Sequence, residues 1–333
     1  MDKIEIKTPF ISLQTDFGFK RAFGSIEHKE ALIVFLNALF EGKLLVNDVK
    51  YHDKEVLPSQ EKGKRIVYDV YCTSLIKRTD SPYFPEGQTT EEGAGETTAD
   101  HHFILEMQNI YTPPFEERIV YYVAKMVAGQ GKAGWDYVLD PVFAVAVTDF
   151  NFTHLSPRTV RDVMLADRDS GEALTDKVHI LLCSLREIPK SWEQCETKLQ
   201  QVLFLIKNMQ NMDNTSLAYR EGKYSVIFEA AKSNALREDE MVAYSQSLEK
   251  LRDTQLGIQY AAKQAAKQAA KEASAKARAE GRAEGRAEGH IEGRAEGRAE
   301  EKIKIAKNML TKGMGKEDIA FFTGLTLSEI ENI

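Results

Sequence analysis

The stretch "HHFILEMQNIYTPPFEER" (residues 101–118) begins as an apolar strand but carries polar residues that such a strand does not need. Glu106 and Gln108 are two residues apart, so on a strand their side chains project from one face, whereas Leu105 and Met107 project from the other. A carboxylate in an apolar strand costs several kcal/mol unless it is paired or bound to a cation. The stretch therefore predicts a strand with a functional polar face.

A second carboxylate poses the same problem earlier in the chain. Asp69 lies in "RIVYDVYC" (residues 65–72), which is rich in β-branched and aromatic residues and predicts a strand. If the two strands are neighbours, Asp69 and Glu106 can share one divalent cation, with a backbone carbonyl and waters completing an octahedron. Gln108 can then orient the attacking water by hydrogen bonding. The alternative, left open by the spacing, is that both carboxylates face solvent on a one-sided sheet.

The hydrophobic periodicity extends this pattern in both directions. The expected elements are helices at 15–24 and 25–42, strands at 46–58, at 64–75 and from 102, a helix at 113–128, a strand at 141–150, two strands around the turn 166–174, and helices at 191–212, 216–233 and 238–260. Residues 77–100 contain few aliphatic side chains and many Thr, Glu, Gly, Ser and Pro residues. This composition predicts a flexible insertion at a hairpin tip.

From Ala261 the sequence repeats every four residues, first as "AAKQ" and then as "RAEG". An α-helix turns every 3.6 residues, so a four-residue repeat drifts around the helix and builds no fixed apolar face. Each glycine also costs about 1 kcal/mol relative to alanine in a helix. We expect residues 261–301 to be a spacer, helical in its first half and only marginally helical in its glycine-containing half.

The last segment, residues 302–333, regains periodic apolar residues in a helix, turn, helix, turn and short helix, which resembles a helix-turn-helix. Two interpretations remain open. The unit is a packing or oligomerisation element that makes the protein a homo-oligomer, or it binds DNA. The first is favoured because the final helix carries no Lys or Arg beyond Lys316.

The composition sets further bounds on function. A chain of 333 residues with 43% hydrophobic residues can form one large core and an accessory region, or two domains. It has no apolar run long enough to cross a membrane and no signal-peptide pattern, so we expect a cytoplasmic protein with no membrane contact. The three cysteines have no metal spacing and predict neither a disulfide framework nor a zinc site. The net charge of −7 means that contact with nucleic acid requires a local basic patch.

Several motifs together resemble the PD-(D/E)XK nuclease superfamily, in particular the recombination-promoting nuclease (Rpn) and PD-(D/E)XK nuclease family transposase group. The motifs are "TDFGFKRAFG" (15–24), "YDVYC" (68–72), "ILEMQ" (104–108), "FEERIVYYVAKM" (115–126), "PVFAVAVTDF" (141–150), the four-residue repeat and "IAKNMLTKGMGKEDIAFFTGL" (305–325). The resemblance covers nearly the whole chain. It implies an α/β (α+β) fold of the restriction-endonuclease type, in which helices flank a central mixed sheet, followed by a helical C-terminal region.

The resemblance also implies a function and a site. It implies a Mg²⁺- or Mn²⁺-dependent DNA endonuclease with a role in recombination, transposition or defence. Asp69 matches the Asp of the motif, Glu106 its second acid, and Gln108 stands in place of its Lys. This last departure motivates an alternative function, a catalytically weak or inactive module for binding or assembly that keeps the nuclease fold.

Four further residues are weaker candidates for the site. Asp16 could approach the metal or serve as a helix N-cap, and Lys20 could contact phosphate or lie on a solvated helix face. Glu30 matches the general position of an acid on the first helix of the superfamily. Arg118 could bind phosphate bidentately or form a surface ion pair with a nearby glutamate.

These interpretations divide the chain into four parts. Residues 1–190 form the nuclease-like domain, including the insertion 77–100, and residues 191–260 form a helical region. Residues 261–301 are the spacer, and residues 302–333 are the small helix-turn-helix-like unit.

Overall fold

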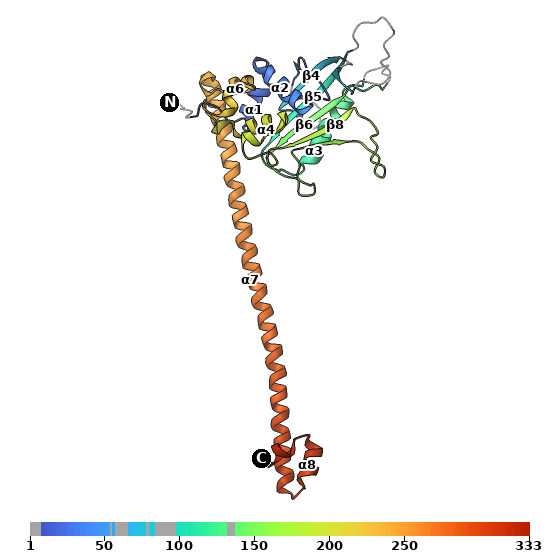
Figure 1. Cartoon of the computed structure of the whole chain (residues 1–333), viewed down its shortest axis with the longest axis vertical. Coiled ribbons are helices and arrows are strands. Elements are labelled where there is room, and N and C mark those ends of the chain that lie inside the picture. The colour runs from blue at the N-terminus through green and yellow to red at the C-terminus, as the bar shows by residue number, and fades with distance from the viewer. Residues whose placement is uncertain (1–7, 54, 57–65, 78–79, 84–97, 132–136) are drawn as a thin grey trace. The chain divides into compact units, whose positions relative to one another are not determined.

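A computed structural model describes residues 8–53, 55–56, 66–77, 80–83, 98–131 and 137–333 (Figure 1). The chain divides into two compact units, Met1–Arg252 and Asp253–Ile333. Among the described residues, no helix has both the length and the apolar composition that crossing a membrane requires.

A mixed six-stranded sheet forms the centre of the first unit, in the order β1-β4-β5-β6-β8-β7. The strands are β1 (Lys50–Tyr51), β4 (Val70–Lys77), β5 (Thr98–Gln108), β6 (Val142–Thr148), β7 (Val160–Met164) and β8 (Val178–Ser184). β5, β6 and β8 are parallel neighbours, whereas β4 pairs antiparallel with β5, and β7 pairs antiparallel with β8. A separate antiparallel pair joins β2 (Glu55–Val56) and β3 (Ile66–Val67). The prediction of a central mixed sheet is confirmed.

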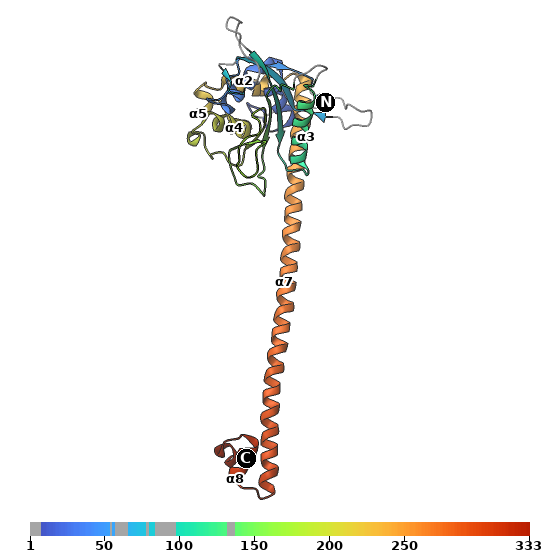
Figure 2. The same cartoon turned by 90° about the vertical axis from the view of Figure 1, so that its right-hand side faces the viewer.

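Helices cover both faces of this sheet, as Figure 2 shows for α2 and α4 on one side and α3 on the other. The helices of the first unit are α1 (Asp16–Phe23), α2 (Lys29–Leu39), α3 (Phe115–Ala128), α4 (Lys198–Asn208), α5 (Leu217–Arg220), α6 (Ser225–Ala231) and the beginning of α7 (Glu238–Thr311). Short 3₁₀ helices lie at Ile26–His28, Trp192–Gln194, Met209–Asn211 and Ser233–Ala235. The restriction-endonuclease-like α/β fold that the sequence predicts is thus confirmed.

Two hydrophobic cores lie on opposite faces of the sheet, because alternate residues of a strand point in opposite directions. Phe103 and Leu105 of β5 belong to the larger core with α1, α2, α4 and α6. Ile104, which lies between them, belongs to the smaller core with α3. Met107 packs against the larger core, so the predicted separation of Leu105 and Met107 from Glu106 is confirmed.

The structure corrects two details of the predicted strands. The strand expected at 64–75 is interrupted, since Tyr68 and Asp69 lie between β3 and β4 and Asp69 occupies a bend. The insertion expected at 77–100 is shorter at both ends, because β4 extends to Lys77 and β5 begins at Thr98. Ser81 is buried and Tyr83 packs against the larger core. Residues 78–79 and 84–97 of this prediction lie outside the described residues.

The second unit contains the remainder of α7, α8 (Lys316–Thr323) and α9 (Leu327–Glu331). α7 covers the whole four-residue repeat, including its glycines, so the expected weakening of the glycine half is not observed. Every side chain from 261 to 301 is exposed, as the drifting period predicts. A small core of Ala306, Ile319 and Ile330 then joins the end of α7 to α8 and α9.

Candidate active site

Asp69 and Glu106 meet at one edge of the sheet, where β4 begins and β5 ends. Val70 pairs with Leu105, so the bend before β4 places Asp69 opposite Glu106. The Asp69 carboxylate accepts a hydrogen bond from the backbone N–H of Met107 at 2.9 Å. Two antiparallel neighbours thus bring together two carboxylates that are separated by a long stretch of sequence.

Glu106 is the most perturbed acid of this edge. Its side chain is buried, and its Oε1 has no hydrogen-bond partner within the described part of the chain. Burial, reinforced by the charge of Asp69, raises the pKa of Glu106 to about 8 from an ordinary value of 4.5. The backbone of Asp69, Arg118 and Lys20 oppose this rise only in part. Glu106 therefore holds a proton at neutral pH unless a positive charge comes close to it.

Lys20 supplies one positive charge from helix α1. Its ammonium group lies 3.2 Å from an oxygen of Asp69 and 2.6 Å from an oxygen of Asp16. Burial alone would lower the pKa of Lys20, but the two carboxylates outweigh it and the pKa is raised. The predicted placement of Lys20 on a solvated helix face is therefore wrong, because the residue is tied to Asp69.

The local sequence of α1 explains how Lys20 reaches this position. Thr15 is the N-cap and accepts a hydrogen bond from the backbone N–H of Gly18 at 3.0 Å. Gly18 is required because a Cβ there would lie 2.0 Å from the carbonyl oxygen of Ser12. The N-cap role predicted for Asp16 is wrong. Asp16 is the first residue of the helix and pairs with Lys20.

Arg118 supplies a second positive charge from α3. Its guanidinium donates to the side-chain oxygen of Gln108 at 2.8 Å, and the carbon at its centre lies 5.1 Å from the ring centre of Phe115. The amide nitrogen of Gln108 donates to the carbonyl of Ile110 at 2.8 Å. Each end of the Gln108 amide therefore has one partner, and its oxygen holds Arg118 in place.

The surface ion pair that the sequence analysis allows between Arg118 and a nearby glutamate does not occur among the described residues, where Arg118 contacts Gln108. Glu116, one of the acids near Arg118, accepts a hydrogen bond from the hydroxyl of Tyr111 at 2.9 Å. Glu30 lies exposed in the first turn of α2. Across the described residues it forms no hydrogen bond or ion pair with Asp69 or Glu106. Glu30 is therefore not brought into this cluster.

Sequence reasoning missed three polar residues at the same edge, Asp149, Arg186 and Asn109. Asp149 follows β6 and donates its backbone N–H to the carbonyl of Gln108 at 3.0 Å, while Arg186 after β8 donates to the carbonyl of Asp149 at 2.8 Å. Asn109 donates to the carbonyl of Gln14 at 2.6 Å, and its Oδ1 is buried without a partner among the described residues. Their positions in the sequence could have identified them, because polar residues that follow neighbouring parallel strands collect at the same edge of the sheet.

Two tyrosines border the carboxylates on the α3 side. The rings of Tyr68 and Tyr122 meet edge to face with centres 5.1 Å apart. Burial, followed by the charge of Glu106, raises the pKa of Tyr122. The hydroxyl of Tyr68 is buried without a partner among the described residues. Both tyrosines therefore lie near Glu106, whose charge adds to the effect of burial in raising their pKa values.

Comparison with protein families agrees with this arrangement. The family described as PD-(D/E)XK nuclease family transposase matches residues 13–79 and 94–261, which is more than half of the chain. The chain belongs to this family. Residues 299–333 match a second description, the C-terminal HTH domain of the Rpn/YhgA-like nuclease family. Comparison with curated proteins and with solved structures gives no match. The resemblance stated from the motifs is thus confirmed, and the second match supports DNA binding by the terminal unit.

A divalent cation fits the carboxylate pair of this family member. No group of three or more His, Cys, Asp or Glu side chains suited to a metal occurs among the described residues, so a cation here would depend on Asp69 and Glu106. The unpartnered Oε1 of Glu106 and the adjacent Asp69 provide hard oxygen donors, which Mg²⁺ and Mn²⁺ prefer. Mg²⁺ sites commonly use one or two carboxylates and several waters.

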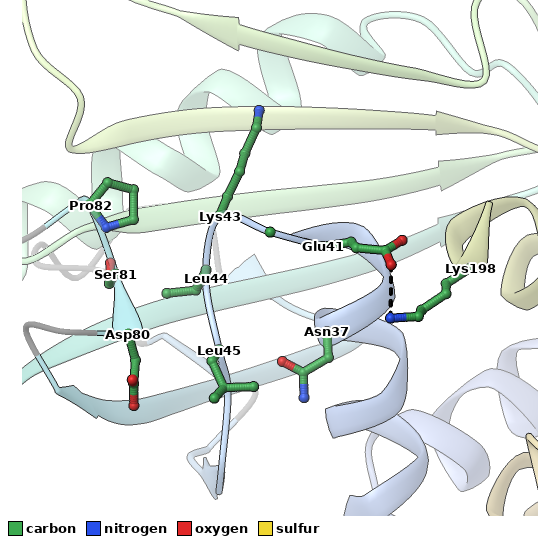
Figure 3. Close-up of a pocket in the computed structure, with 10 residues that line it drawn as sticks. Asn37, Glu41, Lys43, Leu44, Leu45, Asp80, Ser81, Pro82 and Lys198 are labelled. Atoms are coloured by element: carbon green, nitrogen blue, oxygen red, sulfur yellow. Dashed lines mark ion pairs between the residues drawn. The ribbon is translucent and has the colours of Figure 1, made fainter.

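A hollow of about 620 Å³ lies away from these carboxylates, near the opposite end of β4 (Figure 3). It is bordered by the end of α2, the segment 42–45, residues 80–82 and Lys198. Glu41 and Lys198 form an ion pair of 2.8 Å across it. None of the site residues described above lines this hollow.

Proposed function

We propose that the protein is a DNA endonuclease that depends on Mg²⁺ or Mn²⁺ and hydrolyses phosphodiester bonds at Asp69 and Glu106. The observation that carries this proposal is the buried, unpartnered Oε1 of Glu106 beside a second carboxylate. A folded protein retains such a destabilised acid more readily when its charged form has a ligand. Membership of the nuclease family supports phosphodiester hydrolysis as the reaction.

Each residue has a distinct role in this proposal. Asp69 and Glu106 would hold the cation, which when bound supplies an activated water and offsets the charge of the leaving oxygen. Lys20 orients Asp69 through their 3.2 Å contact. Arg118, held in place by Gln108, binds the phosphate and provides positive charge in place of the motif lysine. Gln108 is therefore a positioning residue.

DNA is the proposed substrate because the terminal unit matches a helix-turn-helix domain. In that unit α9 has the sequence LSEIE and carries no basic residue. Three basic side chains, Lys302, Lys304 and Lys307, lie toward the end of α7, whereas Lys312 is in the following turn and Lys316, at the start of α8, pairs with Glu331 at 3.3 Å. We therefore expect this unit to contact the phosphate backbone through α7, which favours binding that depends on salt more than on sequence.

Plasmid cleavage tests the proposed function. Purified protein should nick or linearise plasmid DNA with Mg²⁺ or Mn²⁺ and not with EDTA, and Asp69→Ala or Glu106→Ala should abolish cleavage. Glu30→Ala is the matched control, since it removes an exposed carboxylate outside the cluster and should retain activity. Cleavage that survives both Asp69→Ala and Glu106→Ala would place the reaction elsewhere. A wild-type protein that binds DNA without cleaving it would support the alternative, a binding module with the nuclease fold.

A further inference from the structure

We propose that a groove between α1 and the first turns of α7 binds a nucleotide of the DNA strand next to the phosphate that is cleaved. The proposal rests on the proposed function and adds a substrate-binding site to it. The groove has a volume of about 450 Å³ and lies within the first unit. This volume is in the range of small-ligand sites.

Lys20 connects the groove to the carboxylate site. Asp16 and Lys20 line the groove, and the ammonium group of Lys20 is also 3.2 Å from Asp69. A strand whose phosphate reaches Asp69 and Glu106 therefore has its neighbouring nucleotide at the groove. Lys20 would contact that strand on the side opposite to Arg118, which approaches from α3.

The walls of the groove have the chemistry that a nucleotide requires. Phe17 is half-buried and offers an aromatic surface for base stacking. Gln246 is exposed and offers a donor and an acceptor for the edge of a base. Lys250, one turn further along α7, adds positive charge for the phosphate backbone. Ala243 is small, and this leaves the space between the two helices open.

Three contacts hold α1 in place, two to α7 and one to α6. The backbone N–H of Phe17 donates to the hydroxyl of Ser247 at 3.1 Å. Arg21 forms a nearly buried ion pair with Glu240. Arg21 also donates to the carbonyl of Ala230 at 3.1 Å. Because the groove is fixed by contacts that the ligand does not need to replace, it is already formed before DNA binds.

Thiol protection tests this site in the full-length protein. The three native cysteines are buried and their thiols have raised pKa values, so they react slowly with a maleimide. Gln246→Cys places a reactive thiol in the groove. The matched control is Val242→Cys, on an exposed position of the same helix that does not line the groove. Both thiols are labelled in EDTA with and without a short single-stranded oligodeoxynucleotide, so that no cleavage occurs.

At an oligonucleotide concentration about ten times its Kd, labelling of Gln246→Cys should slow about tenfold, because only the unoccupied fraction reacts. Labelling of Val242→Cys should not change. Equal labelling of Gln246→Cys with and without bound DNA overturns the proposal that the groove binds a nucleotide. If the same preparation still cleaves DNA when metal is added, the proposed function survives that result. Protection without any cleavage supports the groove and overturns hydrolysis. Absence of both protection and cleavage overturns both proposals.

Discussion

Replacing Glu106 with glutamine should stabilise the first unit at pH 8 in the absence of divalent cations, and should have little effect at pH 4.5. The folded protein raises the pKa of Glu106 from 4.5 to about 8, mainly through burial and then through Asp69. The folded state therefore keeps a proton that the unfolded state releases between these pH values. The contribution of Glu106 to the stability of the wild type therefore falls as pH rises from 4.5 to 8. Glutamine is neutral throughout and removes this dependence.

The size of the effect follows from the shift. One pKa unit corresponds to about 1.4 kcal/mol, so the effect of the Glu106 shift on stability is on the order of 5 kcal/mol above pH 8 and approaches zero below pH 4.5. The full effect applies because the side chain is only 8% exposed. A difference of several kcal/mol is a large fraction of the stability of a typical domain.

Urea unfolding at pH 4.5, 6, 7 and 8 in EDTA measures the difference. Tryptophan fluorescence is a suitable signal because both tryptophans of the chain belong to Met1–Arg252. The stability gain of Glu106→Gln over wild type should grow steadily with pH, whereas Glu30→Gln, at an exposed site, should give no such trend. A gain that is the same at all four pH values would refute the reasoning, because it would mean that the folded state does not hold the proton on Glu106.

Three further outcomes are expected. Gln108→Leu removes the acceptor that holds Arg118, so it should lower the cleavage rate by about 10- to 100-fold while metal affinity stays within a few-fold. Gln108→Glu keeps an acceptor oxygen and should lower the cleavage rate less. Equal reductions of the cleavage rate in the two variants would contradict the positioning role. Replacing residues 84–97 by a tight turn should change Tm by less than about 4 °C, because the length of a connection affects stability only weakly. A larger drop of Tm in a thermal scan would show that this segment stabilises the fold. Light scattering should give a multiple of the chain mass for the full-length protein but a single chain mass for a protein ending near Tyr260. The reason is that Phe321 and Phe322 on α8 are 84% and 62% exposed and offer an apolar surface for a second copy. Identical assembly states of the two proteins would exclude the terminal unit as the oligomerisation element.

The sequence predicts much of the sheet and part of the site, because alternation along a strand is a local property. Glu106 and Gln108 lie opposite to Leu105 and Met107, as their spacing requires. The sequence also locates β6 (142–148), since its continuous apolar run from 142 to 147 has both faces buried.

Other features depend on tertiary contacts and cannot be obtained from spacing. The bend at Asp69 is not marked by Gly or Pro, and it is stabilised by a hydrogen bond to the distant Met107. The spacing of Gln108 and Arg118 suggests no partnership, because the first lies on a strand and the second on the following helix. The attachment of Lys20 to Asp69 likewise requires the packing of α1 against the sheet edge.

Calorimetric titration of Mn²⁺ into the metal-free protein tests most directly the claim that Asp69 and Glu106 form a cation site. At pH 7 we expect one site of micromolar to low-millimolar affinity, consistent with carboxylate ligands. Comparison of buffers with different ionisation enthalpies should show release of about 0.9 proton per bound ion, since Glu106, with a pKa of about 8, is mostly protonated at that pH. Asp69→Ala should abolish binding. Binding that persists unchanged in Asp69→Ala, or binding without proton release at pH 7, would contradict the site.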